Sequence, residues 1–187
     1  MKDAELCFEN PLKDSKWPCR PLGDVCEVKR GSTITKKSAI PGDVPVVAGG
    51  ISPAYYHNTP NRPANVITVS GSGANAGYVN FFDVPIWASD CSTVLPKEDG
   101  LNVNYVHRYL LAIQTFIFKE LARGAAQPHV YPRDLAKLAI PLPPLEEQQR
   151  IVAVLDEALE GLARARAHAE ANLQNARELF KNFLGAL

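Results

Sequence analysis

The sequence predicts an α+β fold, in which an irregular, twisted, β-rich head with one packed helix precedes a single long helix. Short runs of β-branched and aromatic residues, separated by Gly, Pro, Asn and Ser, fill residues 44–95 and favour strands joined by turns. Between residues 104 and 122 the apolar residues instead recur at helical spacing. After the prolines of residues 141–144, a proline-free stretch keeps helical spacing almost to the last residue.

Composition sets the limits of this fold. The chain has 187 residues, a formal net charge of zero and 46 % hydrophobic residues, which suits one globular domain plus an extension. Residues 17–142 hold 12 Lys+Arg against 9 Asp+Glu, a net charge of +3, and residues 143–187 hold 5 against 7, a net charge of −2. No apolar run approaches the ~18 residues of a membrane span. The four cysteines lack CxxC spacing, so we expect a reduced, cytoplasmic chain without a membrane segment.

Three segments follow from these patterns. Residues 1–16 are polar and unpatterned and are interpreted as a flexible leader. Residues 17–142 form the predicted head, and residues 143–187 form the predicted long helix.

Within the head, each element has a local signal. The stretch "DVCEVKRG" alternates like a strand that ends in a glycine turn. The helix near 104–122 has Asn104 as a candidate N-cap and Gly124 as a candidate end. The stretch "YPRDLAKLAIPLPP" predicts a short helical turn and a brief strand, stopped by proline.

The long helix is predicted from about residue 144 to 184. Pro143 and Pro144 suit the first positions of a helix, where missing N–H groups cost nothing. Apolar residues then recur every 3.5 residues on average, the spacing of a coiled-coil seam. A rod of some 40 residues spans roughly 60 Å, so its far half needs another helix as cover, although a helix folded back on its own domain is the alternative. The predicted seam comprises Ile151, Leu155, Ala158, Leu162, Ala165, Ala169, Asn172, Ala176, Leu179 and Phe183.

Several of these stretches resemble one known family. "WPCRPLGDVCEVKRG", "GAAQPHVYPRDLAKLAIPLPPLEEQQRIVAVLD" and the long helix after them are similar to the specificity (S) subunit of type I restriction-modification enzymes. The join "IPLPPLEEQQRIV" is the most specific part, and "SGSGANAGYV" and "WASDC" resemble pieces of target recognition domains. The resemblance covers residues 17–187.

The resemblance implies a function. A full subunit of this family has two recognition domains and two long helices, which pair antiparallel so that each domain reads one half of a bipartite DNA site. This chain has one of each, so it is a half-subunit or a fragment. It would then be a non-catalytic subunit without a cofactor, with residues 17–142 as a DNA target recognition domain. Its partners would be double-stranded DNA, methyltransferase subunits and, through them, restriction subunits, so that it directs adenine methylation and cleavage.

Assembly follows from having one helix per chain. We expect a homodimer through residues 145–184, antiparallel as the resemblance implies because the seam alone does not fix the direction, in which two identical heads read an inverted repeat. The residues expected to dimerise are Ile151, Leu155, Leu162, Ala169, Leu179 and Phe183.

Two stretches supply most of the candidate DNA contacts. "KRGSTITKK" gathers cations and hydroxyls that suit phosphate oxygens, with a solvated turn as the alternative. "GGISPAYYHNTPNRP" is rich in side chains that read base edges, with an ordered loop of half-buried tyrosines as the alternative. The candidates are Lys29, Arg30, Ser32, Thr33, Thr35, Lys36 and Lys37 from the first stretch, and Tyr55, Tyr56, His57, Asn58 and Arg62 from the second.

Two further stretches add weaker candidates. "SGSGANAGYVN" departs from the dinucleotide fingerprint, so its glycines indicate a tight turn, and Ser72 and Asn75 could lie close to the DNA backbone. "GAAQPHVYPRDL" is interpreted mainly as structural, with Gln127 and Arg133 as possible contacts to DNA or to another domain.

Other classes of function remain as alternatives. The main alternative is a protein-interaction module without DNA, carried on a dimerising coiled coil. A hydrolase using Cys91 would need a histidine beside the thiol, which the spacing of His57, His107 and His129 does not require. The histidines share no metal-ligand spacing, so neither a catalytic residue nor a metal site is predicted.

Overall fold

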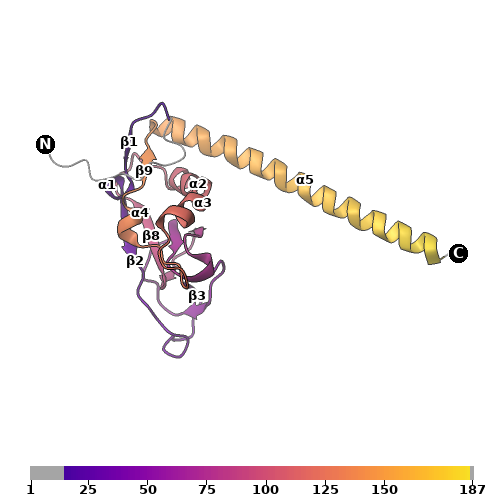
Figure 1. Cartoon of the computed structure of the whole chain (residues 1–187), viewed down its shortest axis with the longest axis horizontal. Coiled ribbons are helices and arrows are strands. Elements are labelled where there is room, and N and C mark those ends of the chain that lie inside the picture. The colour runs from indigo at the N-terminus through magenta and orange to yellow at the C-terminus, as the bar shows by residue number, and fades with distance from the viewer. Residues whose placement is uncertain (1–14, 186–187) are drawn as a thin grey trace. The chain divides into compact units, whose positions relative to one another are not determined.

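The computed structural model describes residues 15–185, so the predicted leader lies outside the described residues except for Ser15 and Lys16. The chain divides into two compact units, Met1–Gln148 and Gln149–Leu187. Figure 1 shows strands and short helices in the first unit and one continuous helix in the second. The predicted α+β class is confirmed.

A four-stranded antiparallel sheet forms the centre of the first unit. Its order is β2 (Cys26–Arg30), β8 (Cys91–Pro96), β5 (Val66–Ser70) and β6 (Val79–Phe82). All five residues of β5 are buried, which fits its sequence VITVS because β-branched side chains pack well on a pleated surface. The edge strand β2 pairs with β8, and Lys29 lies opposite Thr93.

A second sheet lies against the first. It has the order β4 (Tyr55–His57), β3 (Val44–Val47) and β7 (Trp87–Ala88), with β3 antiparallel to β4 and parallel to β7. One buried cluster joins both sheets and consists of Val47, Val66, Ile86, Ala88 and Cys91. Because successive side chains of a strand point to opposite faces, β4 presents Tyr55 and His57 to one side and Tyr56 to the other.

The predicted helix near 104–122 is present but interrupted. It consists of α2 (Val103–Ala112), α3 (Gln114–Phe116) and the π-helical turn η2 (Ile117–Leu121). The predicted N-cap Asn104 is wrong, because the side chain of Asn102 accepts the N–H groups of Asn104 at 2.8 Å and Tyr105 at 3.2 Å. Gly124 has φ +100° and reverses the chain after η2, a conformation that glycine adopts without steric cost.

Short elements complete the first unit. The predicted helical turn and brief strand are confirmed as α4 (Pro132–Leu135) and β9 (Ala139–Pro141). Strand β9 pairs antiparallel with β1 (Cys19–Pro21), so the beginning and the end of the head are joined. The remaining turns are α1 (Leu22–Val25) and the 3-10 turn η1 (Gly73–Asn75).

The long helix α5 runs from Leu145 to Gly185, close to the predicted bounds. The expectation that the prolines occupy its first positions is wrong. The carbonyl of Pro144 accepts the N–H groups of Glu147 at 2.9 Å and Gln148 at 3.0 Å, so both prolines precede the helix and Pro144 supplies its first acceptor.

The junction that leads into α5 is bonded to α2 and to the turn before it. Tyr105 Oη donates to the carbonyl of Pro141 at 2.8 Å, and Tyr109 Oη donates to the carbonyl of Ala139. The Gln148 side chain, only 2 % exposed, accepts the Asn102 N–H at 2.8 Å through Oε1. Its Nε2 donates to the carbonyl of Pro143 at 2.9 Å and to that of Gly100 at 3.2 Å. The Gln148 amide therefore uses all its groups to hold the first turn of α5 on the head.

Replacing Gln148 tests this attachment. Gln148→Leu removes the amide and leaves the Asn102 N–H and two carbonyls without their partner in a buried site. We expect the free energy of unfolding of the head to fall by about 1–3 kcal/mol, measured by chemical denaturation. The matched control is Gln149→Leu at the exposed neighbouring position, which should change stability by less than about 0.5 kcal/mol. Equal stability of the two variants would contradict the attachment.

Candidate nucleic-acid interface

The cationic loop, defined here as residues 31–43, connects β2 to β3. Lys36 and Lys37 are exposed on it, as are Ser32 and Thr33. Thr35 is exposed as well, but its hydroxyl lies 2.8 Å from that of Ser38 and closes a local turn. The loop therefore carries two lysines and two hydroxyls at the surface.

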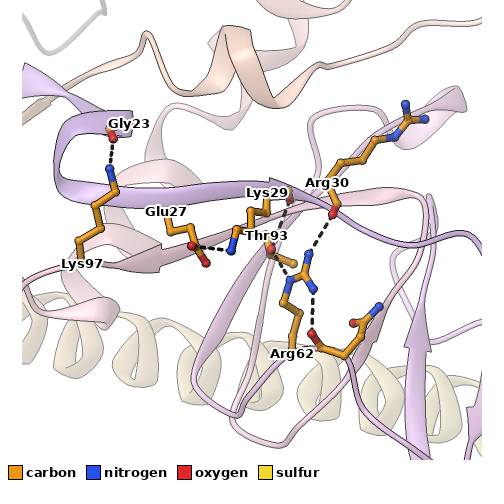
Figure 2. A network of polar contacts seen from close by, with 8 residues as sticks. Gly23, Glu27, Lys29, Arg30, Arg62, Thr93 and Lys97 are labelled. Carbon is orange, nitrogen blue, oxygen red and sulfur yellow. Dashed lines mark hydrogen bonds and ion pairs between the residues drawn. The ribbon is translucent and has the colours of Figure 1, made fainter.

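Lys29 and Arg30, just before the loop, differ in whether an acidic side chain compensates their charge. Lys29 Nζ lies 2.6 Å from Glu27 Oε1, so part of its charge is already compensated on β2. Arg30 is exposed, and Figure 2 shows its side chain pointing away from this ion pair. Arg30 therefore extends the positive surface, whereas Lys29 contributes less to it.

Backbone contacts with the sheets fix the start of the loop. The Gly31 N–H donates to the carbonyl of Cys91 at 2.8 Å, and the Ser32 N–H donates to that of Ala88 at 2.9 Å. A Cβ on Gly31 would lie 2.2 Å from the carbonyl oxygen of Ser89, so only glycine allows this approach. The Trp87 indole Nε1 donates back to the carbonyl of Ser32 at 2.8 Å.

Two side chains of β4 hold the middle of the loop. Tyr55 Oη donates to the carbonyl of Ile34 at 2.6 Å. His57, only 6 % exposed, accepts the Ile40 N–H at its Nδ1 at a distance of 3.0 Å. The rings of His57 and Trp87 are perpendicular, with their centroids 4.8 Å apart. Tyr55 and His57 were predicted to contact DNA, and within the head their side chains form hydrogen bonds to the backbone of the loop. Tyr56 is 55 % exposed, as expected for a residue that contacts a ligand.

The two motifs predicted separately meet at one shallow hollow. Lys36 and Gly42 of the loop line it together with Tyr55 and Tyr56 of β4, and its volume is about 270 Å³. Asn58 is exposed directly after β4. The fold thus places a cation, an exposed aromatic ring and an exposed amide on neighbouring parts of the surface.

Arg62 has a different environment from the one predicted. Figure 2 shows its guanidinium at the centre of a polar network between β2 and β8. Its Nε donates to Thr93 Oγ1 at 2.9 Å, Nη1 to the carbonyl of Asn61 at 2.8 Å, and Nη2 to the carbonyl of Arg30 at 2.8 Å. Three of its five donors are used within the head, which favours a structural role over base reading.

The glycine-rich turn, residues 70–80, and the proline loop, residues 124–135, lie side by side. The Gly73 N–H donates to the carbonyl of Pro128 at 3.0 Å, and the Val130 N–H donates to that of Gly71 at 3.0 Å. The hydroxyl of Ser72 donates to Asp90 Oδ2, so this side chain is occupied within the head. Gly73 and Gly77 have φ values of +78° and +81°, which confirms the structural need for glycine in this turn.

The other candidates of this region differ in accessibility. Asn75 is half-buried beside a hollow that Tyr78, Gln114 and Phe118 also line. Gln127 is exposed in the loop, and the exposed Arg133 has its guanidinium 5.3 Å from the ring centroid of Tyr131.

A small hollow connects this region to the end of β2. Arg30, His129 and Tyr131 line it, so the cation before the cationic loop lies beside the proline loop. Arg30 of "KRGSTITKK" therefore lies beside His129 and Tyr131 of "GAAQPHVYPRDL".

Cys91 lacks the environment of a nucleophile. Its side chain is 2 % exposed, and burial raises the pKa of the thiol to about 12, so the thiol is protonated at neutral pH. The three candidate histidines each lie against an aromatic ring: His57 against Trp87, His107 against Phe81 and His129 against Tyr131. Within residues 15–185, no group of three His, Cys, Asp or Glu side chains is placed to hold a metal ion.

Two residues outside the set of candidate contacts shape this interface. Trp87 holds the loop, and Asn61 bonds to both backbone groups of Ala88, donating from Nδ2 at 2.9 Å and accepting at Oδ1 at 2.7 Å. The available signal was a tryptophan and an asparagine beside strands too short to show alternation.

Comparisons with known proteins agree with this architecture. The sequence profile of the type I restriction modification DNA specificity domain matches residues 14–168. A type I specificity subunit of Mycoplasma pneumoniae is 29 % identical over 142 residues, 75 % of this chain and 38 % of that protein. The MjaIX specificity subunit of Methanocaldococcus jannaschii is 26 % identical over 188 residues, 89 % of this chain and 43 % of that protein.

Solved structures give the same result. The type I S subunit from M. genitalium has a TM-score of 0.67 at 26 % identity and covers 84 % of this chain and 43 % of its own. The HsdS subunit from Thermoanaerobacter tengcongensis has a TM-score of 0.64 at 26 % identity, and the match covers 84 % of this chain and 41 % of that subunit. The chain belongs to the type I restriction-modification specificity subunit family, whose members are non-catalytic, and it spans about two-fifths of the length of these relatives.

Among residues 15–185, no helix is both long enough and apolar enough to cross a lipid bilayer.

Replacing Arg62 separates its structural role from base reading. Arg62→Ala leaves Thr93 Oγ1 and two carbonyls without their charged donor, and we expect the free energy of unfolding to fall by about 1–3 kcal/mol in chemical denaturation. Tyr56→Ala, at an exposed position, is the control and should change stability by less than about 0.5 kcal/mol. If Arg62→Ala left the stability unchanged and altered the preferred DNA sequence, Arg62 would be a base-contacting residue and the structural role would be contradicted.

Proposed function

We propose that this chain is a DNA sequence-reading part of a type I restriction-modification specificity subunit. Residues 17–142 would act as the target recognition domain and residues 143–187 as the spacer helix. One observation carries the proposal beyond family membership: an exposed loop with Lys36 and Lys37, fixed to both sheets, that borders the same hollow as the exposed Tyr56.

The loop would supply the phosphate contacts. Lys36 and Lys37, with Ser32 and Thr33 beside them, would bind the DNA backbone, because releasing condensed counterions from phosphates drives such contacts. Arg30, Gln127 and Arg133 would extend this contact along the neighbouring surface. A loop that is already held in place loses little conformational freedom on binding, which favours affinity.

Base reading would fall to the side chains that remain free. The exposed Tyr56 lines the same hollow as Lys36, and Asn58 is exposed directly after β4. An amide or a phenol can bond base edges in the major groove. Tyr55, His57 and Arg62 would act indirectly, by positioning the loop and the strand ends. Ser72 and Asn75 would lie nearer the backbone of the DNA than its bases.

Chemistry would come from partner subunits. The chain would dock methyltransferase subunits, which bind the methyl donor and take the target adenine out of the duplex, and through them restriction subunits. This chain would determine at which DNA sequence the reaction takes place. No cofactor is assigned to it.

The helix would bring two heads together. Leu155, Leu162, Leu179 and Phe183 are 40–72 % exposed on α5, and pairing with another chain would bury them. An antiparallel homodimer has two-fold symmetry, so its heads would read an inverted repeat. A protein-interaction module without DNA is the alternative, and the DNA experiment below separates the two.

Substitutions in the loop and in β4 should affect DNA binding differently. Lys36→Ala with Lys37→Ala should weaken binding to all duplexes and reduce the slope of log affinity against log salt by about 2, since two phosphate contacts are lost. Tyr56→Ala should instead change which duplex is preferred, by ~1–3 kcal/mol between sequences.

The control for the lysine pair is Lys119→Ala with Lys137→Ala, which removes the same charge from exposed positions outside the loop. It should leave the salt slope of fluorescence-anisotropy titrations unchanged. Equal effects of the two lysine pairs would contradict the role of the loop, and no binding to any duplex by the unmodified chain, with or without methyltransferase subunits, would favour the interaction module.

Leu162→Asp tests the homodimer. Leu162 is 66 % exposed on α5, and a carboxylate there should convert the dimer into monomers in light scattering, because pairing would bury an unpaired charge. Ala167→Asp introduces the same carboxylate on the opposite side of the helix and should stay dimeric. A monomeric unmodified chain at micromolar concentration would remove the homodimer from the account.

A further inference from the structure

The hollow between the cationic loop and β4 has mainly apolar walls. Its volume is about 270 Å³, and five of the six described residues that line it carry no charge. The lining residues are Lys36, Ala39, Pro41, Gly42, Tyr55 and Tyr56.

The side chains around this hollow offer few hydrogen-bonding groups. Three of the lining residues, Ala39, Pro41 and Gly42, have no polar side chain. Tyr55 has a single donor, its hydroxyl, which already bonds the carbonyl of Ile34 at 2.6 Å. A group that enters the hollow would therefore meet mostly carbon atoms.

The hollow exists before any ligand binds, because the loop and the strand are joined to each other in the free chain. The Ile40 N–H donates to His57 Nδ1 at 3.0 Å. A Cβ on Gly42 would lie 2.4 Å from the Cα of Asn58, so the loop backbone lies directly against the chain that follows β4. Walls fixed in this way cannot close over a missing group, so the hollow can distinguish a ligand that fills it from one that does not.

We propose that this hollow receives the C5-methyl group of a thymine in the major groove of bound DNA. The proposal rests on the DNA-reading function proposed above and names the chemical group that is read. The C5-methyl is the only methyl group that unmodified base pairs present in the major groove, and side chains recognise it by apolar contact. The other base edges are distinguished by their donors and acceptors, which apolar walls cannot read.

The charge beside the hollow favours DNA as the occupant over an apolar peptide. Lys36 lines the hollow, and the exposed Lys37 follows it in the loop. The C5 position of a pyrimidine faces the side of the major groove that belongs to its own strand. A cation next to a methyl-binding hollow is therefore well placed to contact a phosphate of that strand.

Deoxyuridine tests the proposal, because it pairs as thymidine does and lacks only the methyl group. In the duplex that the unmodified chain prefers, each thymine is replaced in turn by uracil, and binding is measured by fluorescence anisotropy in the complex with methyltransferase subunits. One position of the half-site should respond, with binding about fourfold weaker for each methyl group lost. The ratio of the two dissociation constants, uracil to thymine, is then the measure of methyl reading.

Substitutions in the walls connect this ratio to the hollow. Ala39→Val adds two methyl groups to the wall and should lower the ratio from about four to about one, because the space for the thymine methyl is filled. Tyr56→Ala removes a different part of the wall and should lower the ratio as well. The matched control is Ala54→Val, at an exposed alanine just before β4 that does not line the hollow, and it should keep the ratio. A general loss of affinity cancels in the ratio, and if Ala39→Val bound no duplex, Tyr56→Ala would decide.

The remaining outcomes separate this proposal from the one on which it rests. A preferred sequence without thymine, a ratio near one at every position, or a ratio unchanged in both wall variants overturns methyl reading and leaves DNA reading standing. Tighter binding when the responding thymine is mismatched indicates that the hollow holds a base turned out of the duplex, and this also overturns methyl reading. Failure to bind any duplex overturns both proposals.

Discussion

The arrangement of the candidate interface depends on hydrogen bonds from three aromatic side chains to the backbone of the cationic loop. Residues 31–43 contain no helix or strand of their own, and apart from the local turn between Thr35 and Ser38 the path of the loop depends on contacts with the sheets. Trp87 and Tyr55 donate to the carbonyls of Ser32 and Ile34, and His57 accepts the Ile40 N–H. Ordering such a loop costs conformational entropy, and in this chain the cost is met during folding instead of during binding.

The same arrangement explains why neighbouring residues of β4 have different roles. Tyr55 and His57 face the loop because the pleat of the strand turns them to one side. Tyr56 faces outward and leaves its phenol available to a ligand. Arg62 bonds the end of β2 to β8, so the residues that lead into the loop are fixed as well. A positive charge is thereby held at the surface without a strongly basic chain.

Periodicity was enough to predict the fold class and the bounds of the long helix, because α5 and the β-rich segments differ strongly in spacing. The stretches that carry candidate contacts were also recognisable from residue types. The directions in which the side chains of Tyr55, Tyr56 and His57 point could not be predicted from residue types. They depend on which side of a three-residue strand the rest of the head covers. The hydrogen-bond partners of Arg62 were not predictable for a similar reason: they lie on β2 and β8, about 30 residues away on either side.

One further misjudgement has a local physical cause. Asn102 and Asn104 are both suitable N-caps by type, and only the backbone path decides between them.

The most direct test of the account is selection from a pool of random DNA duplexes by the unmodified chain, with and without methyltransferase subunits, followed by sequencing of the retained duplexes. The account predicts enrichment of a short sequence repeated in inverted orientation at one fixed spacing, with retention that falls steeply as salt rises. Retained duplexes with no common sequence, or no retention even with methyltransferase subunits at low salt, would contradict the claim that this chain reads DNA.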